Sequence, residues 1–188
     1  MMRIITGKAK GIKLRTLEGN ETRPTAERVK EAVFSMLQFD IEGRSVLDLF
    51  SGSGQMGLEA ISRGAASAVL IDRSREAIKI IEENARKTKL IDQCKIVNSD
   101  ALEYLKRTRN DQFDIIFLDP PYASGLYTPV LKALLHANCL KKNTIIVLES
   151  DIDDLISNDS ELSSAFEVKK SSRYSKTVIT LIGLKEMV

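Results

Sequence analysis

The stretch Ser45-Val-Leu-Asp-Leu-Phe-Ser-Gly-Ser-Gly-Gln-Met-Gly57 decides the fold of this chain. Its first six residues are largely apolar and predict a buried β-strand over residues 45–50. The glycine-rich turn that follows matches the pattern G-x-G-x-x-G, and the next residues predict a helix that continues to about residue 63. A strand, a glycine turn and a helix in this order are typical of a Rossmann-like unit.

The same alternation of strands and helices continues to the end of the chain. Because the strands are nearly continuous apolar runs, we expect a mostly parallel, seven-stranded α/β sheet with helices on both faces. The further strands are expected at residues 68–72, 95–98, 113–118, 144–149, 166–170 and 176–182, with helices starting near residues 74, 101 and 127 and another in residues 151–165.

Residues 1–40 precede this alternating region and are predicted to form a basic extension within a single domain of residues 1–188. The pattern of residues 3–14 resembles a short β-hairpin. A helix should follow, with Thr25 as its N-cap.

Composition is ordinary for one soluble globular domain, with 188 residues, 43% hydrophobic and 29% charged side chains. The formal net charge of +2 hides an asymmetry. Residues 1–30 carry +5, from eight basic and three acidic side chains, whereas residues 151–167 carry six acidic side chains and no Lys or Arg. A basic end can contact phosphates, but it can equally be a solvated surface.

Several classes of site are excluded or disfavoured by what the chain lacks. His136 is its sole histidine, which excludes a histidine-based triad and a multi-histidine metal site. Cys94 and Cys139 lie far apart and lack metal-ligand spacing, so we expect free thiols and no metal. No apolar run reaches the length of a membrane span and no signal peptide is evident, so we expect a cytoplasmic protein without a membrane partner.

Polar motifs follow four of the expected strands. In a parallel sheet the carboxyl ends of the strands meet at one edge, where ligands bind. We therefore expect these motifs to lie together: the loop after Phe50, Asp72, Asn98-Ser99-Asp100 and Asp119-Pro120-Pro121-Tyr122.

The motif Asp119-Pro120-Pro121-Tyr122 directly follows the apolar run at residues 113–118. Asp119 and Pro120 each precede a proline, so both should be extended, with carbonyl groups that no helix uses. A carboxylate, a free carbonyl and an aromatic ring could bind a planar group that bears an amino group. The alternative is a Pro-Pro turn against which Tyr122 packs.

The glycine turn and Asp72 together predict an adenosine-containing cofactor. Gly52 and Gly54 let the backbone approach a ligand, and Asp72 is spaced to accept hydrogen bonds from a ribose diol. Asp48 would be unfavourable beside a diphosphate but favourable beside the ammonium and sulfonium groups of S-adenosylmethionine, and Asp100 could accept from an adenine amino group. These acids favour S-adenosylmethionine over a dinucleotide; a tight packing turn remains the alternative.

Four motifs resemble, in their order along the chain, those of class I S-adenosylmethionine-dependent methyltransferases that modify exocyclic amines. They are Asp48-Leu49-Phe50-Ser51-Gly52-Ser53-Gly54, Asp72, Asn98-Ser99-Asp100 and Asp119-Pro120-Pro121-Tyr122. Residues 47–65 and Arg23-Pro24-Thr25-Ala26-Glu27-Arg28-Val29 resemble the bacterial 16S ribosomal RNA guanine-N2 methyltransferase family, and the resemblance covers nearly the whole chain. Ser175 departs from the Gly that usually follows Tyr in that family, which weakens the prediction of a tight turn there, away from the cofactor motifs.

The resemblance implies transfer of a methyl group from S-adenosylmethionine to an amino group of a flipped or unpaired RNA base. Asp119 and the Pro120 carbonyl would accept the two N–H groups and orient the nitrogen lone pair, while Tyr122 would stack on the base. The residues implied for catalysis are Asp119, Pro120, Pro121 and Tyr122, and those for cofactor binding are Asp48, Phe50, Ser51, Gly52, Ser53, Gly54, Asp72, Arg73, Asp100 and Ala101.

The implied partner is 16S rRNA, within the small ribosomal subunit or an assembly intermediate, bound by a monomer. Guanine N2 rests on the resemblance alone. Since no inserted target-recognition domain is evident, RNA shape would provide specificity, with phosphate contacts from the N-terminal extension. The residues expected to contact RNA are Lys8, Lys10, Lys13, Arg15, Arg23, Thr25 and Arg28.

Other functions are compatible with parts of this pattern. The amine motif also occurs in DNA adenine, DNA cytosine and protein-glutamine methyltransferases, although the glutamine enzymes usually carry Asn at the position of Asp119. A non-catalytic RNA-binding protein on the same fold is a further alternative. A nicotinamide-dependent dehydrogenase would leave Asp119-Pro120-Pro121-Tyr122 without a role.

Overall fold

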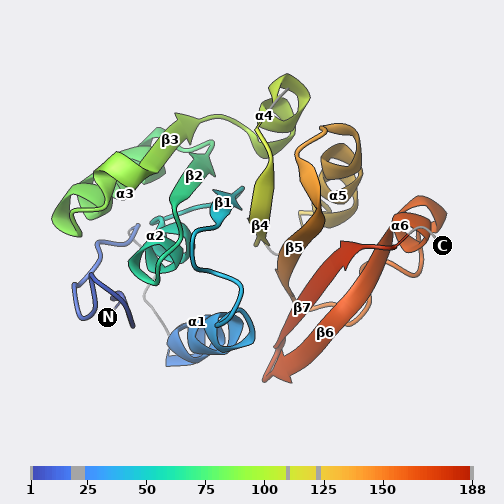
Figure 1. Cartoon of the computed structure of the whole chain (residues 1–188), viewed down its shortest axis with the longest axis horizontal. Helices are drawn as coiled ribbons and strands as arrows, with labels where there is room; N and C mark the ends of the chain where they lie inside the picture. Colours follow the sequence, from blue (N-terminus) through green and yellow to red (C-terminus); the bar gives the residue numbers. More distant parts are fainter. Residues whose placement is uncertain (1, 18–23, 109–110, 122–123, 187–188) are drawn as a thin grey trace.

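The computed structural model describes residues 2–17, 24–108, 111–121 and 124–186, and only the backbone of residues 24–26. Within these residues, seven strands form one sheet in the order β3-β2-β1-β4-β5-β7-β6 (Figure 1). The first five strands run parallel, and β7 is antiparallel to both of its neighbours. The strands are β1 (Ser45–Asp48), β2 (Ser67–Asp72), β3 (Cys94–Asn98), β4 (Phe113–Leu118), β5 (Leu140–Ser150), β6 (Phe166–Tyr174) and β7 (Thr177–Leu184). The expected fold class is confirmed.

Helices cover both faces of the sheet (Figure 1). One apolar core joins the sheet to α1 (Pro24–Met36), α2 (Gln55–Ser62) and α3 (Arg75–Lys87). The other core joins it to α4 (Ala101–Arg107), α5 (Tyr127–His136) and α6 (Ser160–Ala165). A short 3-10 helix, Ile91–Gln93, connects α3 to β3. No helix in the described part of the chain is both long and apolar enough to span a membrane.

Alternation along the central strands divides their side chains between the two cores. Ile115 and Phe117 of β4 belong to the core beneath α1 to α3, whereas Ile116 and Leu118 belong to the opposite core. This alternation follows from the period of two in a β-strand. Both faces are buried, which explains why β4 is a nearly continuous apolar run.

The strand order creates a switch point between β1 and β4. From β1 the chain moves outward through β2 to β3, and it then returns to form β4 on the other side of β1. Loops after β1 and β4 therefore leave the sheet toward opposite faces, and a crevice opens at the carboxyl ends of these strands.

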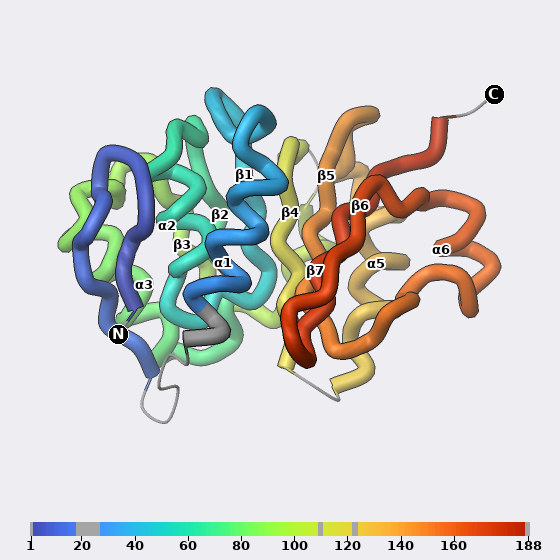
Figure 2. The backbone as a smooth tube through the Cα atoms, turned by 90° about the horizontal axis from the view of Figure 1, so that it is seen from below, coloured from blue at the N-terminus to red at the C-terminus, as the bar shows by residue number. Residues whose placement is uncertain are grey.

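The N-terminal segment differs in detail from the expected hairpin. It is an antiparallel loop with one isolated bridge, Arg3 to Lys13, rather than two strands in a ladder. Figure 2 shows this segment (blue) running beside α2 and α3. The following helix begins at Pro24, so Thr25 lies inside its first turn and is not the N-cap. Proline fits the first helical position because it has no N–H to satisfy there.

Candidate active site

Four acidic residues lie at the carboxyl ends of four adjacent strands. They are Asp72 at the end of β2, Asp48 at the end of β1, Asp119 directly after β4 and Glu149 near the end of β5. The residue two positions before each acid belongs to the core beneath α1 to α3. In the same order, these residues are Leu70, Val46, Phe117 and Val147. Because strand side chains alternate with a period of two, the four acids extend from one face of the sheet.

The loop after β1 is tied to β2 by backbone and hydroxyl bonds. Ser51 donates from its amide to the Ile71 carbonyl at 2.9 Å, and its hydroxyl oxygen accepts from the Ile71 amide at 2.9 Å. The same hydroxyl donates to the Asp48 carbonyl at 2.9 Å. Ser51 thus sets the path of the loop from a buried position.

Glycine is favoured at three positions in this loop and the start of α2, for a different physical reason at each. Gly52 has a φ of +53° with open space where a Cβ would lie, and it lines the central cavity. Gly54 has a φ of +78° and caps the start of α2. A Cβ on Gly57 would lie 2.1 Å from Leu70 Cδ2, so only glycine allows α2 to pack this closely on β2.

Asp72 is held by the backbone on both sides. Its Oδ2 accepts from the Gly52 amide at 2.9 Å, and its Oδ1 accepts from the Ser74 amide at 2.8 Å. The Asn98 side chain donates to the carbonyls of Asp72 and Arg73 at 2.9 and 3.0 Å. Each carboxylate oxygen retains acceptor capacity, so the site can still accept from a diol.

Asp100 has a structural role that the sequence analysis did not assign to it. Its Oδ1 accepts from the amides of Leu102 and Glu103, at 2.9 and 3.3 Å, and so caps the first turn of α4. Asp100 and Ala101 both line the central cavity. The capping bonds fix the carboxylate at the cavity wall.

The corner at Asp119 follows β4 directly. Pro120 is buried, and its carbonyl accepts no hydrogen bond from the described residues, whereas the Pro121 carbonyl accepts from the Ser124 amide at 3.1 Å. A side-chain carboxylate therefore stands beside one unpaired backbone carbonyl, as expected from the two prolines. Tyr122, the expected stacking residue, lies outside the described residues.

Burial raises the pKa of three carboxyl groups, Asp119, Glu149 and Asp48, and repulsion by other carboxylates adds to the shift at Asp119 and Asp48. Partial desolvation, followed by the charges of Glu149 and Asp48, raises the pKa of Asp119 well above its usual range. Asp119 lines the cavity and remains accessible to solvent there. Desolvation raises the pKa of Glu149 to about 7 and that of the buried Asp48 to about 7.

Asp48 is also incompletely hydrogen-bonded. Its Oδ2 is buried and accepts no hydrogen bond from the described residues. Asp48 does not line the central cavity but lies beneath the loop that does. Its charge can therefore act on a ligand through that loop rather than by the direct contact we expected.

One cavity of about 1080 Å³ brings most of the expected site residues together. It contains the predicted cofactor-binding residues Phe50, Ser51, Gly52, Ser53, Asp72, Arg73, Asp100 and Ala101, and the predicted catalytic residues Asp119, Pro120 and Pro121. Gly54, like Asp48, is not part of its lining.

The cavity also contains residues that the sequence analysis missed. Glu149 enters from β5, Met2 and Lys30 from the N-terminal region, and Ser175 from the turn between β6 and β7. Glu149 could have been found as the polar end of an apolar strand. Met2, Lys30 and Ser175 carry no comparable signal, since long-range packing alone brings them to the site.

The turn at Ser175 corrects two expectations. Tyr174 pairs with Thr177, so Ser175 and Lys176 form a tight two-residue turn, and Ser175 has a φ of +59°. A tight turn therefore forms without Gly, with Ser in a left-handed conformation that Gly would adopt more readily. The turn lines the cavity and does not lie away from the cofactor motifs.

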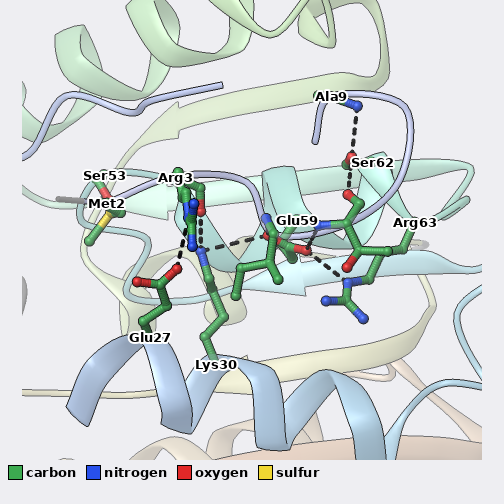
Figure 3. A network of polar contacts seen from close by, with 11 residues as sticks. Met2, Arg3, Ala9, Glu27, Lys30, Ser53, Glu59, Ser62 and Arg63 are labelled. Carbon is green, nitrogen blue, oxygen red and sulfur yellow. Dashed lines mark hydrogen bonds and ion pairs between the residues drawn. The ribbon is translucent and has the colours of Figure 1, made fainter. Parts of the chain in front are cut away.

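A buried carboxylate fixes the N-terminal segment against the site (Figure 3). Glu59 on α2 is fully buried and accepts from the amides of Ile5 and Thr6 at 2.7 and 3.0 Å. It also pairs with Arg63 at 2.8 Å and with the buried Lys30 at 3.6 Å.

Lys30 extends this network to the cavity wall. It donates to the Arg3 carbonyl at 2.6 Å, and desolvation lowers its pKa even though Glu59 acts in the opposite direction. At the same wall, the Ser53 hydroxyl contacts Met2 Sδ at 3.0 Å. Residues 2–17 and α1 therefore contribute to one side of the cavity.

Those basic residues expected to contact RNA that the structure describes lie outside the cavity. Lys8 contacts the Gln93 side chain, and Arg15 pairs with Glu83 at 2.7 Å. Lys10, Lys13 and Arg28 are exposed. Arg23 and the Thr25 side chain lie outside the described part of the chain.

The donors and charges of the cavity fit S-adenosylmethionine. Its described lining includes five acidic side chains and three basic ones, which suits a ligand with a sulfonium and an ammonium group. The open space at Gly52 and the orphaned Oδ2 of Asp48 beneath the loop agree with this assignment. The described residues do not bring three or more His, Cys, Asp or Glu side chains into an arrangement suited to a metal ion.

Residues 2–183 match the protein family described as Conserved hypothetical protein 95. The chain is 35% identical over 148 residues to ribosomal RNA small subunit methyltransferase D of Buchnera aphidicola, which covers 79% of this chain and 77% of that protein. It is 35% identical over 153 residues to the Escherichia coli K12 protein of the same name, with 81% and 76% covered.

A solved structure supports the same relationship. The fold matches that of yhhF from Escherichia coli, described as a candidate methyltransferase, with a TM-score of 0.85 and 29% identity. The match covers 99% of each chain, so it includes the N-terminal segment as well as the sheet.

Proposed function

We propose, from the premise that this chain belongs to the family described as Conserved hypothetical protein 95, that it methylates the N2 amino group of a guanine in 16S rRNA. The chain is an S-adenosylmethionine-dependent methyltransferase that acts on ribosomal RNA. The observation that supports an amine as the acceptor is the pair formed by the Asp119 carboxylate and the Pro120 carbonyl, which accepts no hydrogen bond from the described residues, in one cavity with the Gly52 loop.

The cofactor would be held by residues of three strand ends. Asp72 would accept from the ribose hydroxyl groups, Asp100 from the adenine amino group, and the loop at Ser51 to Ser53 would contact the amino-acid part. When bound, S-adenosylmethionine supplies an electrophilic methyl group on a positively charged sulfur. The raised pKa of Asp48 indicates that its ionised form would be favoured by a nearby positive charge.

Asp119 and Pro120 would orient the acceptor amine. The two N–H groups donate to the carboxylate and to the carbonyl, which directs the nitrogen lone pair toward the methyl group. That lone pair would form the new N–C bond as the S–CH3 bond breaks and its electron pair stays on sulfur, with S-adenosylhomocysteine as the leaving group. The methylated nitrogen would then lose a proton. The Asp119 carboxylate, which would already accept an N–H group of this amine, is placed to take that proton. Tyr122 would stack on the base.

The N-terminal extension would contact the RNA backbone. Lys8, Lys10, Lys13, Arg23 and Arg28 could neutralise phosphates and position the substrate without reading its sequence. Arg15 is the weakest candidate, since it already pairs with Glu83. We further propose that a monomer acts on the small subunit or an assembly intermediate in the cytoplasm.

Transfer of labelled methyl groups tests the function directly. Purified protein is incubated with labelled S-adenosylmethionine and, separately, naked 16S rRNA, small ribosomal subunits, duplex DNA and ribosomal proteins, and the modified nucleoside is identified by mass spectrometry. We expect N2-methylguanosine in the RNA. Label in DNA or in protein contradicts the proposal.

The role of Asp119 has a separate test. Asp119→Ala should abolish transfer while S-adenosylhomocysteine still binds with the wild-type affinity by calorimetry. Asp92→Ala, which removes an exposed acid outside the cavity, is the matched control and should keep wild-type transfer. If Asp119→Ala lost cofactor binding as well, its assignment to the acceptor amine would be wrong.

Charge reversal tests the RNA-contacting surface. Lys10→Glu combined with Lys13→Glu should raise the KM for the RNA substrate and reduce the salt dependence of binding by about two phosphate contacts. Lys142→Glu combined with Lys185→Glu, at exposed sites outside the cavity, should change neither. Equal effects of the two pairs would contradict a specific role of the extension.

A further inference from the structure

Glu149 is a cavity carboxylate that the proposed methyl transfer has not used. It lies one residue before the end of β5, on the same face of the sheet as Asp119, and it is half-buried. Its backbone is fixed, since the Tyr127 hydroxyl donates to the Glu149 carbonyl at 2.5 Å. In the described part of the chain, no hydrogen-bond donor or cation contacts its carboxylate.

The register of the sheet places Glu149 beside Asp119. Phe117 is paired with Val147 and Leu118 with Leu148, so Asp119 and Glu149 occupy the next opposed positions of parallel strands. Neighbouring strands lie about 4.8 Å apart. The charge of Glu149 contributes to the raised pKa of Asp119, which agrees with close carboxylates. Two adjacent acceptors that repel each other are stabilised by a ligand that offers two adjacent donors.

Guanine offers such an edge, and the other bases with amino groups do not. On its Watson–Crick edge the N2 amino group is adjacent to the N1–H group, so both neighbours are donors. In adenine and in cytosine, the amino group is adjacent to a ring nitrogen that accepts and carries no hydrogen. An ionised carboxylate at that position would accept from guanine and repel the lone pair of the other two bases.

We propose that Glu149 accepts the N1–H of the target guanine and is the residue that selects guanine for methylation. The inference rests on the proposed transfer to guanine N2 and adds to it the physical basis of base selection. In this scheme Asp119 and Pro120 bind the amino group, whereas Glu149 recognises the N1–H group adjacent to it.

An RNA substrate with 2-aminopurine at the target position tests this role. This base keeps the 2-amino group, but its N1 carries no hydrogen. We expect wild-type kcat/KM for 2-aminopurine to be about 100-fold or more below that for guanine, as for sites that lose a buried hydrogen bond. Glu149→Gln should reduce this ratio at least about tenfold, since its amide can donate to N1 of 2-aminopurine as well as accept from guanine.

The controls separate base selection from folding and from the methyl-transfer proposal. Glu149→Gln should bind S-adenosylhomocysteine with wild-type affinity. Asp151→Asn, which changes another cavity carboxylate, should leave the guanine to 2-aminopurine ratio unchanged. If Glu149→Gln lowers both rates equally, or keeps the wild-type ratio, the inference is wrong although methylation of guanine N2 stands. If the wild-type protein labels adenine or cytosine, both proposals are wrong.

Discussion

The Gly52 amide donates a 2.9 Å hydrogen bond to Oδ2 of Asp72, across 20 residues of sequence. This bond joins the loop after β1 to the end of β2 and so fixes the distance between the two parts of the expected cofactor site. Asp72 therefore acts twice, as an organiser of the loop and as an acceptor for the ligand. A change at this position should affect both roles together.

Asp72→Ala should weaken binding of S-adenosylhomocysteine by about 10- to 100-fold, because a carboxylate hydrogen bond contributes about 1.5–3 kcal/mol. Isothermal titration calorimetry measures this loss. Asp100→Ala should weaken binding less, since Asp100 does not hold the glycine loop. Equal affinities of the Asp72→Ala variant and the wild type would contradict the assigned role.

Glu59→Ala should destabilise the fold by about 3–5 kcal/mol, as expected when one partner of a buried ion pair is removed. It leaves Lys30, which is 3% exposed, without its counter-charge, and the Ile5 and Thr6 amides without acceptors. Urea unfolding measures the change. Glu82→Ala, which breaks an exposed pair with Arg86, should cost about 0.5 kcal/mol or less.

The stability of the Asp48→Asn variant, relative to that of the wild type, should increase as the pH rises. The pKa of Asp48 is raised from 3.8 to about 7 in the folded chain, so between these values the folded state keeps a proton that the unfolded state has released. Stability contributed by this group therefore falls from pH 4 to pH 7. The variant removes that loss, and its unfolding free energy relative to wild type should rise by on the order of 2–4 kcal/mol from pH 4.5 to pH 8.

An exposed acid with the opposite shift provides the control for this pH dependence. Hydrogen bonds from Ser157 and then from the Ile156 amide lower the pKa of Asp154. Its ionised form stabilises the fold above its ordinary pKa, and this contribution is lost as the pH falls. Asp154→Asn should therefore lose relative stability as the pH rises. Both variants are measured in cofactor-free protein. If their stabilities relative to wild type changed in the same direction with pH, the opposite pKa shifts assigned to Asp48 and Asp154 would be wrong.

Gly57→Ala should destabilise the fold by about 1–2 kcal/mol despite the better helix propensity of alanine. Overpacking destabilises by about 1–3 kcal/mol, and the higher helix propensity of alanine offsets up to about 1 kcal/mol of this loss. The new Cβ would lie 2.1 Å from the side chain of Leu70, so combining it with Leu70→Val should recover stability. Gly183→Ala, whose Cβ would meet the flexible end of Lys169 at 3.1 Å, should be better tolerated.

Much of the sheet could be predicted because its strands are buried on both faces. The expected bounds of β4, residues 113–118, are those observed, since its apolar run is interrupted only at Asp114 and ends at Asp119. Strand β5 was expected at residues 144–149 but spans Leu140–Ser150. Its first residue, Leu140, pairs with Phe113, but Lys141, Lys142 and Asn143 are polar and interrupt the apolar pattern that predicts a strand.

The site was predictable where a motif and a strand end coincide. Asp72 and Asp119 were predicted in this way to lie together at one edge of the sheet, and both line the cavity. Lys30 illustrates the limit, because its sequence context suggests an exposed basic residue and the structure buries it beside Glu59. Glu149 can be recognised as the polar end of an apolar strand, but its place beside Asp119 cannot. Neither the Lys30–Glu59 ion pair nor the proximity of Glu149 to Asp119 can be derived from local sequence, since each depends on long-range packing.

The dependence of the N-terminal segment on Glu59 also has a consequence for the order of folding during synthesis. The amides of Ile5 and Thr6 find their acceptor 54 and 53 residues later in the chain. During translation this segment leaves the ribosome first but cannot dock until α2 has emerged and packed on β2. We therefore expect one wall of the cofactor pocket to form only after the first βαβ unit has folded, so that the nascent chain acquires its binding site late.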